Sequence, residues 1–380
     1  MDPARDNAGE GKKFRPYRNR LIAVAIALII VIAGFTLYYT STNKPPGPNT
    51  LIIYTYSSFL GSGANRTQAM NVVFGTFEKE YNVSITVENL TAPLLQTLEA
   101  QKSNPQADIV IGLDNINSLQ AVSDGLLVKY VPPAQNYINK TLLSEMGNAS
   151  AYVTPYEHGY LGLDYNKSFF GGKNLTPSFS NISSNSSIAK NLLIENPMTD
   201  ETGTEFLLWE IAYYKYMLHE NWTLWWSSMK PYLTGHTYSG WTSAFYNFET
   251  GPGTNLVVSY LTDPAYFHWS GTYNASASTV TFNNGTAYGW DSVYGIGIVN
   301  GSGKLALDRE FVNYFLSPTV QNELPLNEWM YPANSTISPP PLFNYVQNQS
   351  LIHPLNLYMG PATISANLLN WETEWQITMS

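Results

Sequence analysis

The chain has 380 residues, of which 44% are hydrophobic, 14% aromatic and only 12% charged, and its net charge at pH 7 is −9. This length is enough for two domains, and the negative charge argues against nucleic acid as a partner because phosphate backbones are bound by clustered Lys and Arg. The chain has no cysteine, which excludes disulfides, thiolate zinc sites, cysteine nucleophiles and a lipidated cysteine anchor.

The first fifty residues divide into a tail, an apolar segment and a linker. Residues 1–20 are polar and basic, which predicts a cytoplasmic tail. Residues 21–39 (LIAVAIALIIVIAGFTLYY) contain no charge and are long enough, as a helix, to cross a membrane. A cleaved signal peptide is the alternative. We favour an uncleaved transmembrane anchor because the apolar run is long and no small-x-small site precedes Thr40. Residues 40–50 are rich in proline and predict a linker.

From residue 51 onward, apolar runs and helical periodicity alternate along the chain. The predicted strands are 51–54, 83–87, 108–112, 192–194 and 256–258. The predicted helices are 70–81, 94–102, 116–124, 205–218, 222–233, 244–248, 305–316 and 368–378, with a further one beginning at 317. This order predicts an α/β fold with a mainly parallel sheet.

Two apolar segments interrupt the alternation and are interpreted as crossings between two lobes. They are 152–165 (YVTPYEHGYLGLDY) and 289–299 (GWDSVYGIGIV). The stretches 171–188 and 195–203 are rich in turn-forming and polar residues and are expected to be surface loops.

Asn-x-Ser/Thr sequons occur at unusual frequency. The asparagines are Asn65, Asn82, Asn89, Asn139, Asn148, Asn166, Asn174, Asn181, Asn185, Asn221, Asn274, Asn284, Asn300, Asn334 and Asn348. The pattern is consistent with a glycosylated, outward-facing domain, although high Asn and Ser content alone explains part of it. Together with the low charge and the lack of Cys, it suggests an archaeal surface protein in an acid habitat.

No catalytic or metal-binding constellation is present in the sequence. There is no HExxH pair, no nucleophile elbow and no phosphate-binding loop. The adjacent Tyr213 and Tyr214 would suit an iron site, but they lie in an amphipathic helical run and are expected to pack. We therefore expect no enzymatic activity and no cofactor or metal.

Aromatic and acidic residues recur where strands give way to loops. Tyr56 follows the first strand and Asp114 follows the strand at 108–112, while Trp241, Tyr260 and Tyr266 surround the strand at 256–258 and Trp329 lies in a late loop. In α/β folds, ligands bind just beyond the carboxyl ends of strands. Ring faces attract a cation and a carboxylate bonds an amine. This pattern predicts a cage for a flat or cationic small molecule; the alternative is a core cluster.

Asp114 has two possible roles. It lies two residues before the helix predicted at 116–124, and Asp ahead of a helix is a common N-cap. It also follows a strand, where it would meet a ligand. One side chain can serve both purposes.

Several ordered motifs along residues 51–378 resemble the thiamine-binding solute receptors of ABC transporters, in the periplasmic-binding-protein type II superfamily. They are YTYSSF (54–59), ADIVIGLDN (107–115), PYEHGYLGLDYNKS (155–168), ENPMTDETGTEFLLW (195–209), SGW (239–241), SYLTDPAY (259–266), LSPTVQNELPLNEWMYP (316–332) and NWETEW (370–375). The resemblance implies a two-lobed fold with a hinge, preceded here by one transmembrane helix, in an archaeal membrane-anchored form.

The resemblance also implies roles for individual residues. Tyr56 would stack on a ring of thiamine, Asp114 would bond the aminopyrimidine, and Trp241, Tyr260, Tyr266 and Trp329 would complete an aromatic enclosure. The loop 199–203 occupies the place where relatives present hydroxyl groups to a phosphate tail. Here it carries Asp200 and Glu201, which should repel phosphate, so we expect a preference for unphosphorylated thiamine.

The expected domains are lobe one, residues 51–157 and 293–380, and lobe two, residues 158–292, with the hinge near 155–165 and 289–298.

We expect a monomer at the cell membrane, with its binding domain outside the cytoplasm, that delivers thiamine to an ABC permease. A polyamine or other cation receptor of the same fold is the alternative. A glycosylated surface protein without a small ligand is a third possibility.

Overall fold

The structure is a computed structural model that describes residues 49–251, 253–272, 274–281 and 285–380. The expected tail 1–20, the anchor 21–39 and nearly all of the linker 40–50 lie outside the described residues. Among the residues that are described, no helix has the length and hydrophobicity needed to cross a membrane.

In the described residues, a ten-stranded mixed sheet runs in the order β2-β1-β3-β11-β4-β7-β5-β6, and β8 and β12 both pair with β4. Its strands are β1 (Thr50–Tyr56), β2 (Ser84–Leu90), β3 (Ile109–Asp114), β4 (Val153–Asn166), β5 (Leu192–Glu195), β6 (Thr237–Tyr238), β7 (Leu256–Tyr260), β8 (Ala275–Ser278), β11 (Asp291–Ile298) and β12 (Tyr331–Pro332). A smaller sheet contains β9 (Val280–Thr281), β10 (Ala287–Gly289) and β13 (Ile352–Pro354). The five strands predicted from the sequence are all present.

The prediction of a mainly parallel sheet is wrong at its centre. β1 pairs with β3 in parallel, and β5 pairs with β6 and β7 in parallel. However, β4 and β11 run antiparallel to each other, and β11 runs antiparallel to β3. These two strands are the segments interpreted as crossings. Both are buried almost throughout, so their sequences lack the alternation that marks a strand with one exposed face.

The helices follow the predicted positions with shifts of a few residues. The α-helices are α2 (Arg66–Met70), α3 (Thr76–Tyr81), α4 (Leu94–Ala100), α5 (Asn117–Ser123), α6 (Lys140–Glu145), α7 (Phe179–Ser184), α8 (Ser186–Ala189), α9 (Glu201–Ile211), α10 (Thr223–Leu233), α11 (Trp241–Thr250), α12 (Asp263–Ser270), α13 (Leu305–Phe315), α14 (Pro318–Gln321) and α15 (Pro361–Met379). The π- and 3₁₀-helical segments are η1 (Asn71–Gly75), η2 (Pro133–Tyr137), η3 (Gly147–Ala151), η4 (Ala212–Met217), η5 (Pro341–Tyr345), η6 (Gln349–Leu351) and η7 (Leu355–Tyr358).

The stretch 171–188, expected to be a surface loop, contains two short helices. Ser178 caps α7 by accepting a hydrogen bond from the Asn181 N–H at 3.0 Å, and Asn185 caps α8 in the same way. Phe179 and Ile182 are fully buried. Residues that look like loop formers therefore act as N-caps for helices too short to show a periodic pattern.

Two large hydrophobic cores lie on the two parts of the sheet. The first gathers residues between Leu51 and Tyr156 and between Val293 and Ala333. The second gathers residues between Leu161 and Trp290, with fully buried Trp209 and Trp226. The second core also contains Ile116 and residues near the end of the chain. The lobe bounds expected from the sequence stay a prediction.

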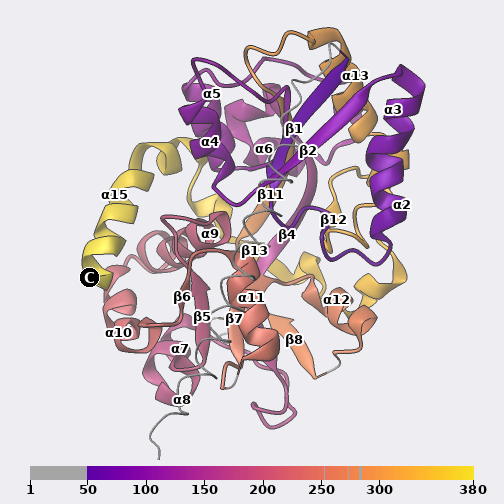
Figure 1. Cartoon of the computed structure of the whole chain (residues 1–380). Helices are drawn as coiled ribbons and strands as arrows, with labels where there is room; N and C mark the ends of the chain where they lie inside the picture. Colours follow the sequence, from indigo (N-terminus) through magenta and orange to yellow (C-terminus); the bar gives the residue numbers. More distant parts are fainter. Residues whose placement is uncertain (1–48, 252, 273, 282–284) are drawn as a thin grey trace, which may run out of the picture. The chain divides into compact units, whose positions relative to one another are not determined.

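The end of the chain differs from the expected division. Residues 293–380 were all assigned to lobe one, but Trp371 and Trp375 of α15 belong to the second core. The ring of Trp375 lies 5.8 Å from that of Trp226 in an edge-to-face contact, and Figure 1 shows α15 beside α10. The chain therefore returns to the second core after completing the first.

Candidate functional site

A cleft of about 650 Å³ lies among the ends of β1 and β7, the strands β4 and β11 and the beginnings of α9 and α11. This volume suits a small organic molecule. Of the eight site residues predicted from the sequence, seven line the cleft. They are Tyr56, Asp200, Glu201, Trp241, Tyr260, Tyr266 and Trp329. Asp114 does not line it.

Tyr56, the last residue of β1, owes its position to a glycine on the neighbouring strand. Gly112 has φ +104°, and a Cβ at this position would lie 2.4 Å from Cδ1 of Tyr56. Only glycine combines this backbone conformation with the space for the ring. The Tyr56 ring also packs at 5.8 Å from the ring of Tyr294 on β11. Its face is thereby fixed at the wall of the cleft.

The Tyr56 hydroxyl lies between two carboxyl groups. It is 2.7 Å from Oε2 of Glu328 and 3.1 Å from Oε1 of Glu157, and the Tyr156 hydroxyl is 3.3 Å away. Glu328 also accepts a hydrogen bond from the backbone N–H of Leu60. Burial raises the pKa of Glu328 to about 8. Burial, followed by the charge of Glu328, raises the pKa of Glu157 well above its usual range.

Tyr260, at the end of β7, is held by hydroxyl groups. Its hydroxyl lies 2.7 Å from that of Tyr294 and 3.2 Å from Oγ1 of Thr202. Burial, followed by the charge of Glu205, raises the pKa of Tyr260 well above 10. The phenol therefore stays neutral and contributes its ring and a hydrogen-bonding oxygen.

Trp241 is fixed at both its backbone and its ring. It begins α11, and its ring stacks on Phe245 at 4.8 Å. The indole Nε1 donates to Oγ of Ser259 at 2.9 Å, and this hydroxyl donates to Asp263 at 2.5 Å. The helix predicted at 244–248 begins at Trp241 in the structure. A ring anchored in this way is a rigid platform for a flat ligand.

Tyr266 and Trp329 approach each other from distant parts of the chain. Their rings lie 5.6 Å apart edge-to-face. The hydroxyl of Tyr266 donates to Glu249 at 3.2 Å, and Nε1 of Trp329 donates to the Ser62 carbonyl at 3.1 Å. Trp329 adopts φ +57°, a conformation that bulky residues rarely take and that is often found at functional sites.

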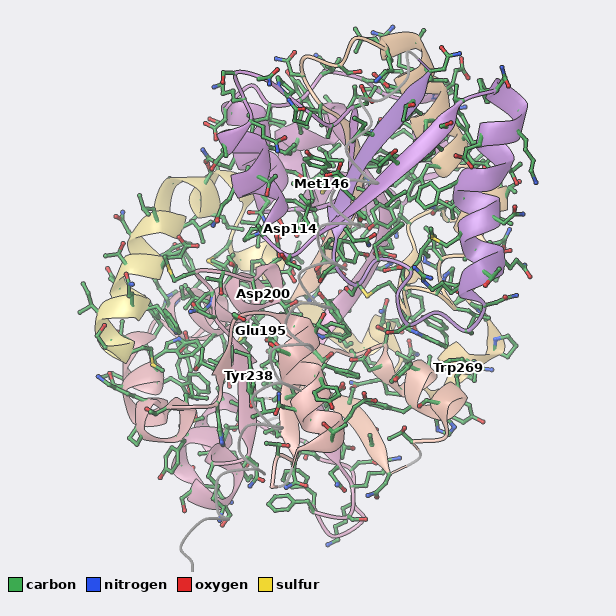
Figure 2. The ribbon with its side chains drawn as sticks, viewed as in Figure 1. Asp114, Met146, Glu195, Asp200, Tyr238 and Trp269 are labelled. Carbon is green, nitrogen blue, oxygen red and sulfur yellow. The ribbon has the colours of Figure 1, made fainter. Side chains whose placement is uncertain are left out.

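Asp200 and Glu201 begin α9 rather than lying in a loop, as the sequence had suggested. Asp200 is the N-cap, and its Oδ1 accepts from the Gly203 N–H at 3.2 Å while its Oδ2 accepts from the Trp241 N–H at 3.0 Å. Burial raises the pKa of Glu201 to about 8, with smaller contributions from the charges of Asp114 and Asp200. In the view of Figure 2, Asp200 is labelled near the middle of the molecule, with Asp114 above it.

Asp114 is fully buried and its carboxylate serves the turn that precedes α5. Oδ1 accepts from the backbone N–H groups of Ile116 at 2.8 Å and Asn117 at 2.5 Å, and Oδ2 accepts from the Asn117 side chain at 3.0 Å. These contacts give the carboxylate a structural role in the turn before α5, whose N-cap residue is Ile116. The carboxylate lies behind the cleft wall, where its charge acts on Glu201 and Tyr294.

The ionisable side chains that line the cleft are acidic or phenolic. Six acidic residues line it, namely Glu157, Asp200, Glu201, Glu249, Asp263 and Glu328. No Lys, Arg or His is found among the described residues that line it. Across the described chain, no group of three or more potential metal ligands is arranged to hold a metal ion. Acidic and aromatic walls without a balancing base favour an organic cation.

Glu157, Glu328 and Tyr294 were missed by sequence reasoning. Glu157 and Tyr294 lie in β4 and β11, which were interpreted only as crossings. Glu328 immediately precedes Trp329 in the late loop, but the sequence analysis assigned only Trp329 to the site. The pairing of Tyr294 with Glu157 across β4 and β11 brings these groups together, and no local pattern reveals that register.

Comparison with known proteins gives a consistent result. Residues 63–322 match the model of the family described as bacterial extracellular solute-binding protein. The thiamine-binding periplasmic protein of Escherichia coli K12 is 28% identical over 87% of this chain and 93% of its own length. A solved periplasmic thiamin binding protein superposes with a TM-score of 0.73 at 25% identity, covering 88% of this chain and 99% of that one. A putative spermidine/putrescine ABC transporter protein from Listeria monocytogenes shares the fold, with a TM-score of 0.62 at 14% identity over 87% of this chain and 99% of that one.

Proposed function

The chain belongs to the family of bacterial extracellular solute-binding proteins, and we propose that the solute it captures is thiamine. As in other solute-binding proteins, the work is binding and release rather than catalysis. The observation that carries the proposal is the composition of the cleft, in which aromatic rings and six acidic residues face a space of about 650 Å³. Thiamine unites two flat rings with a permanent positive charge, so it uses both features.

The aromatic residues have distinct parts in the proposal. Tyr56 and Tyr260 flank the shared wall near Tyr294, and Trp241 offers the rigid platform backed by Phe245. Tyr266 and Trp329 pack against each other in a further part of the cleft wall. Each ring face that meets a cation stabilises it by about 0.5–2 kcal/mol. For Asp114 we propose that the carboxylate holds the turn before α5 and influences the ligand only through its negative charge, because it does not line the cleft.

We further propose that the unphosphorylated form of thiamine is preferred. A phosphate tail is usually bound by the N–H groups at a helix N-terminus. Here the carboxylate of Asp200 already accepts hydrogen bonds from the beginnings of both α9 and α11. Glu201 lies beside it in the cleft. A phosphate at this end would meet the carboxylate of Asp200, and also that of Glu201 once the pH exceeds the pKa of about 8 to which burial raises it.

The cellular setting is also a proposal, and the composition of residues 1–39 supports it. Residues 21–39 would anchor the protein in the cell membrane, residues 1–20 would face the cytoplasm, and the binding domain would lie outside. A receptor in this position would deliver thiamine to an ABC permease in the same membrane. The many sequons suit a glycosylated outer domain.

A ligand panel tests the proposal against its alternatives. The full chain in detergent is heated with thiamine, thiamine monophosphate, spermidine or buffer alone. Saturating thiamine at about a thousandfold excess over its Kd adds about 4 kcal/mol to the free energy of unfolding. We therefore expect the melting midpoint to rise by several degrees with thiamine, and by less with the monophosphate.

Other outcomes select the alternatives. A rise with spermidine and none with thiamine would replace thiamine by a polyamine, which the six acidic residues would also accommodate. A midpoint unchanged by all three compounds would favour a surface protein without these ligands.

A further inference from the structure

Two acidic residues in the cleft converge on a single hydrogen. The Tyr56 hydroxyl lies within hydrogen-bonding distance of both Glu157 and Glu328, at 3.1 and 2.7 Å. A phenol has one hydrogen and can donate it to only one of these oxygens. With both carboxyl groups ionised, the other oxygen would face the Tyr56 oxygen without a hydrogen between them, and the Tyr156 hydroxyl, which also interacts with Glu157, is a further phenol at this place. A further proton, or a cation, is therefore favoured between these two carboxyl groups.

The second oxygen of Glu157 supports this reading. Glu157 is 1% exposed and lines the cleft, yet its Oε2 has no hydrogen-bond partner among the described residues. An ionised buried oxygen without a partner is costly. A protonated carboxyl group, or a cation in the cleft, removes that cost.

Among the residues that the structure describes, no Lys, Arg or His lines the cleft beside this pair. Tyr56 comes from β1, Tyr156 from β4 and Tyr294 from β11, and all three are phenols whose pKa is raised well above 10 by burial. Arg66 is the basic side chain next to Leu60, whose backbone N–H binds Glu328. Its Nε donates to the Leu60 carbonyl at 3.0 Å. The remaining acidic residues of the cleft add negative charge only.

We propose that Glu157 and Glu328 share one proton in the unliganded protein and release it when a cationic ligand enters, so that capture exchanges a cation for a proton. This inference rests on the proposed function, because it takes thiamine as the cation. The balance is simple: the singly protonated pair and the thiamine cation give the doubly ionised pair with bound thiamine and one proton in solvent. The raised pKa of both carboxyl groups agrees with a proton held there near neutral pH.

Calorimetry of the full chain with thiamine in buffers of different ionisation enthalpy measures the released protons directly. At pH 7 we expect close to one proton per thiamine bound, seen as a binding heat that varies with the buffer. By linkage, thiamine affinity should rise by up to about tenfold per pH unit between pH 6 and 7 and level off above about pH 8. An uncharged thiamine isostere should release no proton.

Glu328→Gln and Glu157→Gln imitate the protonated side chain at nearly equal volume. Either change should abolish the proton release and flatten the affinity between pH 6 and 8. Glu210→Gln is the matched control, because Glu210 is a buried acid of the second core whose Oε2 accepts from Nε1 of Trp226 at 3.0 Å and which does not line the cleft. This variant should keep the full proton release.

Binding heats that are independent of the buffer would overturn the exchange while leaving thiamine binding intact. Proton release that persists in both the Glu328→Gln and Glu157→Gln variants would also overturn it, since another group would then be the source. No heat with thiamine at any pH would contradict the proposed function instead. The same buffers with spermidine would then decide the exchange, because the pair responds to positive charge.

Discussion

The carboxylate of Asp200 accepts a hydrogen bond from the backbone N–H of Trp241 at 3.0 Å. A side chain at the beginning of α9 thereby occupies the beginning of α11, which would otherwise attract an anion. The same contact fixes the first residue of α11, whose indole lines the cleft. One hydrogen bond thus fixes the position of Trp241 and places a carboxylate at the N-terminus of α11.

Replacing Asp200 by Asn should weaken the discrimination against phosphate. The amide oxygen of Asn retains an acceptor for the Trp241 N–H, while the negative charge is lost. We expect thiamine monophosphate to gain about tenfold or more in affinity relative to thiamine, which corresponds to about 1.4 kcal/mol. Competitive titration of both compounds at pH 7.5 measures the ratio. If the wild-type protein already binds the monophosphate more tightly, the assigned role of Asp200 is incorrect.

Trp241→Ala should reduce thiamine affinity without unfolding the protein. The loss includes the ring face and the platform formed with Phe245, so we expect a decrease of at least about tenfold. Tyr137→Ala serves as a control, because Tyr137 is 54% exposed and lies outside the cleft. Equal effects of the two changes on affinity would remove Trp241 from the site.

Gly112→Ala should disturb both stability and binding. A Cβ at this position would lie 2.4 Å from the Tyr56 ring, on a backbone with φ +104°. We expect the free energy of unfolding to fall by about 1–3 kcal/mol, and the displaced ring should bind thiamine more weakly. Gly125→Ala is the control: it also has a positive φ, +69°, but nothing within 4 Å of its added Cβ. A Gly112 variant that binds thiamine normally would show that the position of Tyr56 is unimportant.

The buried acids predict that the protein is most stable in acid. Burial raises the pKa of Glu145 to about 9, and of Glu201 and Glu328 to about 8. Asp164 and Glu195 are also buried, and their pKa is raised well above the usual range. The folded state therefore binds more protons than the unfolded state above about pH 4.5, and the free energy of unfolding falls as pH rises from there towards 9.

Thermal melting between pH 4.5 and 9 checks this dependence. We expect the highest midpoint near pH 5 and a continuous decrease at higher pH, and each such group contributes up to about 1.4 kcal/mol per pH unit within its titration range. Glu195→Gln should reduce the slope, because Glu195 is fully buried and neither of its carboxyl oxygens has a partner among the described residues. A midpoint that rises from pH 5 to 8 would contradict the prediction.

The structure also separates the sequons that a glycan could reach from one that it could not. Asn334 is fully buried, and its Oδ1 accepts from the N–H and hydroxyl of Thr336. Asn139 and Asn185 make the equivalent bond to the residue two positions ahead but are exposed. In the Asn-x-Ser/Thr pattern the asparagine therefore stabilises a local turn in addition to being the acceptor type for glycans. Peptide mass spectrometry of the native protein should find glycans at exposed asparagines and none at Asn334.

The order of strands and helices could be predicted because their hydrophobic periods are local. The pairing of β4 with β11 could not, since these strands are buried on both faces and meet across more than 120 residues of sequence. The packing of α15 on the second core includes the Trp226–Trp375 contact. Neither segment's own sequence predicts this contact.

The site was predicted in part for a similar reason. Aromatic residues at strand ends converge because strand ends meet at one edge of a sheet, and Tyr56, Tyr260 and Trp329 line the cleft as expected. Asp114 follows a strand in the same way, yet its oxygens are taken by the turn before α5. Glu157 depends on strand register, so it became visible only in the folded chain.

The central claim is that the acidic aromatic cleft binds thiamine, and calorimetric titration of the full chain with thiamine at pH 7 tests it most directly. We predict a single site with submicromolar affinity in the wild-type protein and a loss of at least about tenfold in Trp241→Ala. Absence of binding heat, or equal affinities for the wild-type protein and the variant, would contradict the claim.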